Sequence, residues 1–351
     1  MSVDIKHSTL PRYDRSRSYE WNYEHAPDPI DVAVPEIAGE WSFLGLPVAS
    51  PLGVAAGPLL NGKWVLYYAS LGFDVLTYKT VRSVQRACYP APNLIPVAAD
   101  QLAGAGLELN ETPEMHGTWA VSFGMPSKAP DYWRRDVAAT RERLPPDKIL
   151  SVSVVGTIQP GWTTDDLADD YARCAKWAVE SGADVVEANF SCPNVSTCDG
   201  QLYQQPESAA CVAERIRQAI GPTPFLLKVG YFAELDLAAE VLDAVAPYVS
   251  GWASTNSVIA RVRNDQGDLE FDGQPRGICG DATRSASIAQ VEFLARQATS
   301  RGHDVKFIGV GGVSTAEHLQ AFLEAGAEGV HLATSVMVDP AVGLRIRATW
   351  P

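Results

Sequence analysis

The residues of this chain best suited to chemistry stand in one short run, residues 189–194 (Asn-Phe-Ser-Cys-Pro-Asn), directly after an apolar segment of strand length. A thiolate at Cys192 could act as a base on a carbon acid. An inert, buried thiol is the commoner state of a cysteine in a reducing compartment. Because enzymes built on parallel strands keep their reactive side chains just past the strand ends, we favour the catalytic interpretation of Cys192. Cys198, further along the same segment, could gate or protect it.

Three asparagines, Asn189, Asn194 and Asn256, follow predicted strands. Each side-chain amide carries a donor and an acceptor on a short stem, which suits a ring with alternating N–H and C=O groups. A single asparagine at a strand end is usually a helix cap or a turn former. Three of them around one end of a sheet favour a binding role.

Two lysines, Lys79 and Lys228, end predicted apolar strands. An ammonium group buried without a partner is costly, so each lysine needs an anion nearby. A salt bridge to a carboxylate and a Schiff base with a carbonyl substrate are both possible interpretations. Stabilisation of an anionic ring in a bound cofactor is the third.

A glycine-rich turn, with Gly309, Gly311 and Gly312, ends another predicted strand and opens a helix. Glycine lets backbone N–H groups approach a phosphate, and the positive end of the helix favours its charge. Thr334 and Ser335, after the next strand, add further donors. A tight turn that needs glycine is the simpler explanation of the glycines alone, but together with Thr334 they predict a phosphate site.

The elements that position these residues alternate regularly: from residue 52 onward, apolar runs of strand length alternate with longer segments of helical period. The predicted helices are 63–71, 132–143, 164–181, 207–220, 234–245, 288–301, 315–325 and 340–348. The predicted strands are 52–56, 73–79, 149–155, 184–190, 225–229, 251–255, 305–310 and 329–333. Eight rounds predict an α/β fold of the (β/α)8 type, a TIM barrel. A doubly wound open sheet is the alternative.

Two stretches interrupt the alternation, residues 82–131 and 257–285, which are rich in Gly, Pro, Asn and Asp. They are expected to be long loops after strands 2 and 6, on the face where barrel enzymes build their sites. The predicted organisation is an N-terminal extension, residues 1–40, followed by one barrel, residues 41–351.

Composition narrows the class of protein further. Hydrophobic residues make up 46% and charged residues 20% of the 351, which indicates a large core. A net charge of −14 argues against nucleic acid or an anionic membrane as the partner. The six cysteines form no CxxC pair, so we predict neither a metal site nor a disulfide framework, and a reducing cytoplasm. No signal peptide or long apolar span is visible.

The run at residues 189–194 resembles the signature of the dihydroorotate dehydrogenase family. Within that family it is similar to the soluble class 1 members, which carry Cys as the base where membrane-associated class 2 members carry Ser. The resemblance extends from about residue 44 to residue 337. It includes residues 50–57 (SPLGVAAG), Lys79-Thr80, residues 122–126 (SFGMP), Lys228, Asn256-Ser257, Gly311-Gly312 and Ala333-Thr334.

The resemblance implies that FMN lies across the barrel mouth, with its phosphate on Gly311, Gly312 and Thr334. It places Lys228 near the N1/C2 carbonyl edge of the flavin and Lys79 against both flavin and substrate. The other flavin-binding residues that it implies are Ala56, Gly57, Thr80, Asn189, Gly280 and Ala333.

The implied reaction is the oxidation of dihydroorotate to orotate in pyrimidine biosynthesis. Cys192 would remove a proton from C5 while C6 delivers a hydride to flavin N5, with Lys79 as the second catalytic residue. The loop of Cys192 and residues 122–127 would form a substrate lid. The implied substrate-binding residues are Lys79, Gly124, Asn189, Asn194, Asn256 and Ser257.

The sequence departs from the family pattern on the substrate side. The lid of class 1 members begins Asn-Ser-x-Gly, and here the position of that asparagine is Val121. Cys279 stands where a small Ser or Gly is usual, and residues 258–263 lack the expected glycine. Because a lost polar contact can change the substrate of an enzyme, we hypothesise that Arg261 or Arg263 supplies it.

The electron acceptor is less readable from the sequence. Residues 1–40 lack the apolar stripe of the quinone-linked relatives, which disfavours quinone. NAD-linked relatives need a partner subunit with FAD and an iron–sulfur cluster, and this chain has no cluster-type cysteine spacing. Fumarate, or such an electron-transfer partner, is the expectation, with a homodimer by analogy to the soluble class.

Three other functions are weighed against this one. The first is an FMN oxidoreductase that acts on another dihydropyrimidine or unsaturated ring. The second is a Schiff-base lyase that uses Lys228 on a phosphorylated sugar. The third is a non-catalytic barrel, in which substitution of Cys192 would change only affinity.

Overall fold

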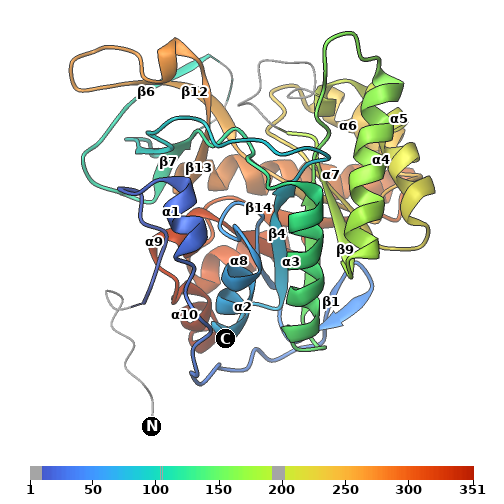
Figure 1. Cartoon of the computed structure of the whole chain (residues 1–351), viewed down its shortest axis with the longest axis horizontal. Helices are drawn as coiled ribbons and strands as arrows, with labels where there is room; N and C mark the ends of the chain where they lie inside the picture. The colour runs from blue at the N-terminus through green and yellow to red at the C-terminus, as the bar shows by residue number, and fades with distance from the viewer. Residues whose placement is uncertain (1–9, 103, 105, 192–201) are drawn as a thin grey trace.

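The computed structural model describes residues 10–102, 104, 106–191 and 202–351. Two predicted site residues, Cys192 and Asn194, therefore lie outside the described residues, as does Cys198. Figure 1 shows the described part of the chain, with helices arranged around a central sheet.

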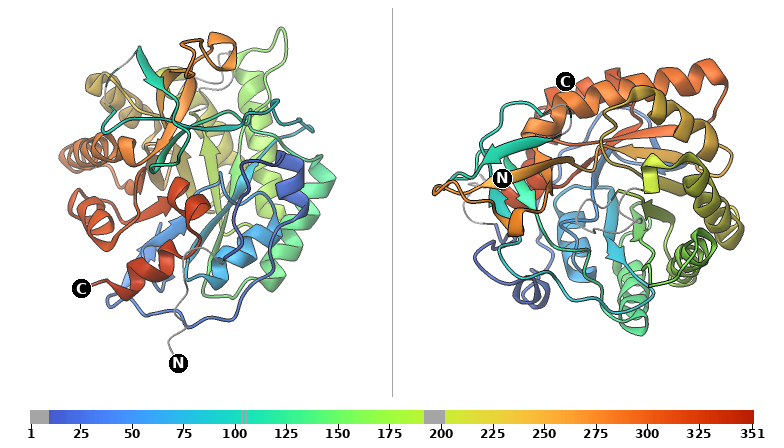
Figure 2. Two further views of the ribbon diagram at one scale, coloured as in Figure 1. Left: turned by 90° about the vertical axis from the view of Figure 1, so that its left-hand side faces the viewer. Right: turned by 90° about the horizontal axis from the view of Figure 1, so that it is seen from above.

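The central sheet is a closed barrel of eight parallel strands, as the alternation predicted. It closes where β15 pairs with β3, with His331 opposite Gly53. Seen along its axis in the right-hand view of Figure 2, the barrel is ringed by helices. The strands are β3 (Leu52–Val54), β4 (Val75–Val81), β8 (Ile149–Val154), β9 (Val185–Asn189), β10 (Phe225–Lys228), β11 (Gly251–Ser254), β14 (Lys306–Val310) and β15 (Gly329–Leu332).

The predicted helices are present with small shifts at their ends. Helix α7 begins four residues earlier than predicted, because its first turn (Arg-Ser-Ala-Ser) carries no apolar periodicity. The five-residue helix α9 (Thr334–Val338) was missed because it is too short to show a period. The helices that match the eight predicted ones are α2 (Gly62–Ser70), α3 (Pro130–Arg143), α4 (Thr164–Glu180), α5 (Pro206–Ile220), α6 (Leu235–Val245), α7 (Arg284–Arg301), α8 (Ala316–Glu324) and α10 (Val342–Ala348).

The lower half of the barrel interior is apolar. Inward side chains of the strands, such as Val75, Val185 and Leu226, form one buried cluster. A hairpin of β1 (Trp41–Phe43) and β2 (Leu46–Val48) closes the amino-terminal end of the barrel by adding Phe43 to this cluster. The site must therefore lie at the opposite, carboxyl end.

The prediction that residues 82–131 and 257–285 are irregular loops is wrong in part, because they pair with each other. They form a five-stranded sheet in the order β5-β7-β13-β12-β6 above the barrel mouth. These strands are short, and the pairings of β7 with β13 and of β12 with β6 join segments more than one hundred residues apart, so no local period predicts the sheet. They are β5 (Leu94–Pro96), β6 (Leu107–Asn110), β7 (Thr118–Val121), β12 (Val258–Arg263) and β13 (Arg276–Gly280), with 3₁₀ turns at Phe271–Gly273 and Asp281–Thr283.

The N-terminal segment packs on the barrel. Helix α1 (Tyr19–Glu24) has Ser18 as its N-cap, and the Oγ of Ser18 accepts a hydrogen bond from the backbone N–H of Trp21 at 3.1 Å. Tyr19 and Tyr23 are buried in the main hydrophobic core. No helix within the described ranges has the length and apolarity needed to cross a bilayer.

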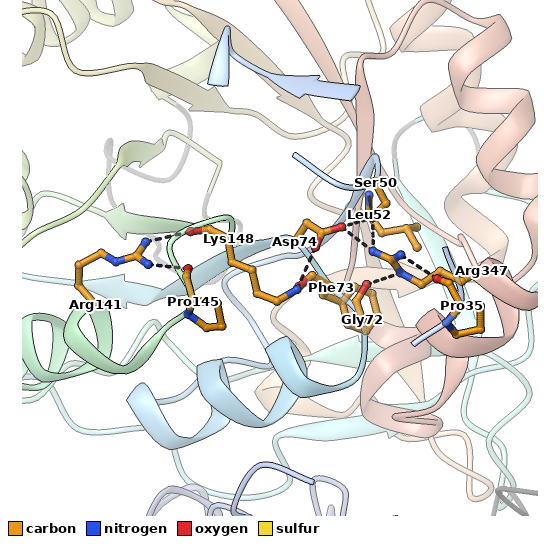
Figure 3. Close-up of polar contacts among 10 residues, drawn as sticks. All are labelled: Pro35, Ser50, Leu52, Gly72, Phe73, Asp74, Arg141, Pro145, Lys148 and Arg347. Carbon is orange, nitrogen blue, oxygen red and sulfur yellow. Dashed lines mark hydrogen bonds and ion pairs between the residues drawn. The ribbon is translucent and has the colours of Figure 1, made fainter. Parts of the chain in front are cut away.

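A buried ionic network joins the C-terminal helix to the barrel (Figure 3). Asp74, just before β4, accepts hydrogen bonds from Arg347 of α10 at 2.5 Å and from Lys148 at 2.9 Å, and it also pairs with Ser50. Arg347 in addition donates to the carbonyls of Gly72 and Pro35. Arg347 thereby joins helix α10, near the C-terminus, and Pro35, near the N-terminus, to the start of strand β4.

Candidate active site

A cavity with an empty volume of about 880 Å³ opens at the carboxyl ends of the barrel strands, beneath the five-stranded sheet. The sequence-predicted residues from distant parts of the chain converge on it. Those that line it are Ala56, Gly57, Lys79, Thr80, Gly124, Asn189, Lys228, Asn256, Ser257, Ala333 and Thr334.

A smaller cavity of about 300 Å³ adjoins the first and shares Asn256, Ala333 and Thr334 with it. Its wall holds Gly280, Gly311 and Gly312 of the prediction. These glycines have φ values of 115°, 129° and 67°, which other residues rarely adopt. A Cβ on Gly280 would stand 2.0 Å from a backbone oxygen, so the chain needs glycine there to come this close.

The two predicted lysines are both buried, with 7% of Lys79 and 4% of Lys228 exposed. Lys228 makes no hydrogen bond or ion pair within the described residues. Its charge affects neighbouring groups: burial, together with the nearby Lys228 ammonium, lowers the pKa of His331 to about 3. Burial raises the pKa of Cys279 to about 11, against the opposing effect of Lys228. A cation without a described counter-ion faces this cavity.

Two of the three predicted asparagines, Asn189 and Asn256, are linked through Ser191. Asn189 accepts a hydrogen bond from the backbone N–H of Ser191 at 3.1 Å, and Asn256 donates to the carbonyl of Ser191 at 3.0 Å. Ser191, the residue before Cys192, is itself buried and lines the cavity. The chain thus reaches the wall of the cavity directly before the predicted base.

Residues 40–349 match the sequence pattern of the dihydroorotate dehydrogenase family. This chain belongs to that family. Family membership makes it an oxidoreductase that acts on a CH–CH donor. The earlier inference from residues 189–194 is confirmed at this level.

Named relatives cover most of the chain. It is 29% identical over 363 aligned residues to dihydroorotate dehydrogenase from Dictyostelium discoideum, which covers 95% of this chain and 96% of the relative. It is 29% identical to dihydroorotate dehydrogenase (quinone) from Clavibacter michiganensis subsp. michiganensis, over 81% and 76% of the two chains. The catalytic subunit of dihydroorotate dehydrogenase B (NAD(+)) from Methanocaldococcus jannaschii is 25% identical, over 64% and 68%.

A solved structure shares the fold. The crystal structure of the Eimeria tenella enzyme DHODH, in complex with ferulenol, superposes with a TM-score of 0.74 over 94% of this chain and 88% of that chain. The two sequences are 18% identical, so this likeness concerns the fold alone.

The departures from the family pattern face the cavity. Val121, at the end of β7, and Cys279, in β13, both line it. Their backbones belong to paired strands, with Val121 opposite Gly277 and Cys279 opposite Trp119. Two positions of the cavity wall are thus apolar or weakly polar, where the resemblance implied an amide or a small residue.

The hypothesis that Arg261 or Arg263 supplies the missing contact is wrong for this structure. Neither residue lines the cavity. Arg263 instead pairs with Glu108 of β6 at 2.8 Å, and Arg261 is exposed on β12. Alternation along β12 explains this outcome, because Val258, Ala260 and Val262 take the buried face.

Residues 122–127, expected as part of a lid, are held by hydrogen bonds at several points. Asn93 donates to the carbonyl of Ser122 at 2.8 Å, and the backbone N–H of Tyr89 donates to that of Phe123 at 3.0 Å. Ser127 forms an isolated β-bridge with Arg86. Three residues of this segment, Phe123, Gly124 and Met125, line the cavity.

Two buried polar residues below the cavity were not predicted. Glu187 in β9 and His331 in β15 are fully buried, and none of their polar side-chain atoms finds a hydrogen-bond partner among the described residues. Each lies two residues before a predicted site residue, Asn189 and Ala333, which is the spacing of side chains on one face of an extended strand. That spacing was the available signal.

Proposed function

We propose that this protein is an FMN-dependent dihydroorotate dehydrogenase, which oxidises dihydroorotate to orotate in pyrimidine biosynthesis. The observation that carries the proposal is the buried Lys228 ammonium, which lines the larger cavity and has no described counter-ion. An anionic flavin edge is the partner that such a cation lacks. The names of the relatives supply the substrate.

The cavity residues fit FMN. A Cβ on Gly57 would meet no described atom within 4 Å, so the space beside this residue is free for a ring. Helix α9 begins at Thr334 without a side-chain cap, which leaves backbone N–H groups at the smaller cavity for a phosphate. Gly311 and Gly312 form the opposite wall of that cavity.

FMN, when bound, supplies a hydride acceptor at N5. The chain provides the rest: in our proposal the thiolate of Cys192 takes the proton from C5 of dihydroorotate as the hydride leaves C6 and the C5=C6 bond forms. Asn189, Asn194 and Asn256 hold the amide groups of the pyrimidine ring, with Gly124 and Ser257 beside them. Lys79 touches both ligands.

A second candidate is an FMN oxidoreductase for another dihydropyrimidine or unsaturated ring. The observation that favours it is the cavity wall, where Val121 stands at the position of the class 1 amide and Cys279 at that of a small Ser or Gly. A site that lacks one polar contact can prefer a different ring by orders of magnitude.

Our proposal extends to the setting of the enzyme. We propose a cytoplasmic homodimer that passes electrons to fumarate, or to a partner subunit with FAD and an iron–sulfur cluster. Residues 10–40 contain a single short helix, α1, which supports an acceptor other than quinone. We also propose that residues 41–351 are the barrel proper and residues 1–40 an extension.

The test is an anaerobic titration of the purified, FMN-loaded protein with dihydroorotate. We expect the flavin absorbance to bleach at one equivalent per FMN. Cys192→Ala is expected to slow bleaching by about 100-fold or more, because a general base contributes that much. Cys211→Ala, which changes a cysteine on α5 outside the cavity, should bleach like the wild type. A flavin that stays oxidised with dihydroorotate, but bleaches with another dihydropyrimidine, would favour the second candidate.

A further inference from the structure

Lys79 lies between aromatic rings that come from two other parts of the chain. Its ammonium stands 4.9 Å from the ring centroid of Phe123 and 5.4 Å from that of Tyr19. Phe123 follows β7 and lines the cavity, whereas Tyr19 belongs to helix α1 of the N-terminal segment. Both distances fall within the range of a cation–π contact.

The two rings are themselves fixed by further aromatic contacts. Phe123 packs edge-on against Tyr13 at 5.9 Å and against Tyr19 at 6.0 Å. Tyr13 and Tyr19 are 7% and 6% exposed, so the rings are shielded from water. A cation–π contact is stronger where water is excluded. Burial also raises the pKa of the Tyr19 hydroxyl, so this residue acts as a neutral ring.

The N-terminal segment is held in place by hydrogen bonds to the first barrel helix. Asn61, the N-cap of α2, donates to the carbonyl of Tyr23 at 2.7 Å. Trp64 donates to the carbonyl of Asn22 at 3.0 Å, and Tyr67 donates to that of Pro11 at 2.7 Å. The position of Tyr19 is therefore set by the barrel itself.

We propose that Tyr19 is a positioning residue of the active site: together with Phe123 it holds the Lys79 ammonium at the cavity wall. The N-terminal segment, residues 10–40, thereby completes the site. The part of this inference that concerns turnover rests on the proposed function of Lys79 against flavin and substrate. The part that concerns the ammonium group stands on the geometry alone.

The test compares Tyr19→Leu, which removes the ring, with Tyr19→Phe, which keeps it. Trp21→Leu is the matched control, since Trp21 lies on the same helix but is 36% exposed. Each FMN-loaded protein is treated briefly with N-hydroxysuccinimide acetate, and the acetylation of each lysine is measured by mass spectrometry. Lys228 reports general unfolding, and the exposed Lys63 reports the reagent.

We expect Tyr19→Leu to raise acetylation of Lys79 by roughly five-fold while Lys228 stays protected. Tyr19→Phe and Trp21→Leu should leave Lys79 as protected as in the wild type. In steady-state kinetics with dihydroorotate, Tyr19→Leu should lower kcat/KM by about ten-fold, and Tyr19→Phe should stay within about two-fold.

Two results would overturn the inference. One is a Tyr19→Leu protein in which Lys79 is as protected as in the wild type. The other is Tyr19→Phe behaving like Tyr19→Leu, which would assign the effect to the hydroxyl. If Tyr19→Leu exposes Lys228 as well, Phe123→Leu removes the second ring and must give the same selective exposure of Lys79. Wild-type protein that fails to turn over dihydroorotate while the labelling pattern holds would refute the proposed function and leave the positioning role standing.

Discussion

At the scale of single residues, the site combines buried groups that water would ordinarily solvate. Lys228 and His331 are close enough for the charge of the lysine to lower the pKa of the imidazole. Glu187 adds a buried carboxylate without a described partner. Burial of these polar groups costs free energy, and such buried polar groups are typical of functional sites.

His331 makes the stability of the protein depend on pH in a defined window. Its pKa is about 3 in the folded protein and near 6.5 when exposed, so the unfolded chain binds more protons between these values. Above pH 6.5 the imidazole is neutral in the folded and the unfolded chain, and this residue does not lower the free energy of unfolding. Below pH 6.5 the free energy of unfolding falls with the pH, by up to roughly 4 kcal/mol at pH 3. Urea unfolding of wild type and His331→Gln at several pH values measures the difference.

The variant is expected to lose less stability than the wild type between pH 6.5 and 4. His116→Gln, which changes an exposed histidine, is the control and should follow the wild type. Parallel curves for the wild type and His331→Gln would contradict the assignment.

At the scale of elements, the site depends on fixed junctions between barrel, sheet and chain ends. The mouth is roofed by a sheet in which two pairings, β7 with β13 and β12 with β6, join segments more than one hundred residues apart. At the amino-terminal end of the barrel, helix α10 is joined to the start of β4 by the ion pair of Asp74 and Arg347 (Figure 3). The side chains of this pair are 2% and 4% exposed.

Arg347→Met should destabilise the protein by about 3 kcal/mol, because it leaves a carboxylate buried beside fewer donors. Chemical denaturation measures this loss. Arg296→Met, which breaks an exposed pair with Glu292 on α7, should cost less than about 1 kcal/mol. Equal losses in the two variants would show that α10 is not anchored by this network.

At the scale of the whole molecule, the sequence predicted the barrel because each strand and helix carries a local hydrophobic period. It also predicted the cavity residues, since strand ends of a barrel meet at one face. The five-stranded sheet above the barrel mouth was missed because its strands are short and two of its pairings, β7 with β13 and β12 with β6, are long-range. Tyr19 was missed because nothing in residues 10–40 indicates which element the helix will face. Arg263 was assigned wrongly because the partner, Glu108, is set by the same long-range pairing.

Binding of FMN in the cavity at the carboxyl end of the barrel can be tested directly at Gly57. A side chain added there meets free space, so Gly57→Leu should keep the fold and fill the place of the ring. The measurement is calorimetric titration of FMN into the flavin-free protein, wild type and variant, with thermal unfolding as a check of the fold. We predict one FMN per wild-type chain. In the variant the affinity for FMN should be weakened by about 100-fold or more, because the leucine side chain fills space that the flavin would occupy. Equal FMN affinity in the two proteins, or a wild-type protein that takes up no FMN, would contradict it.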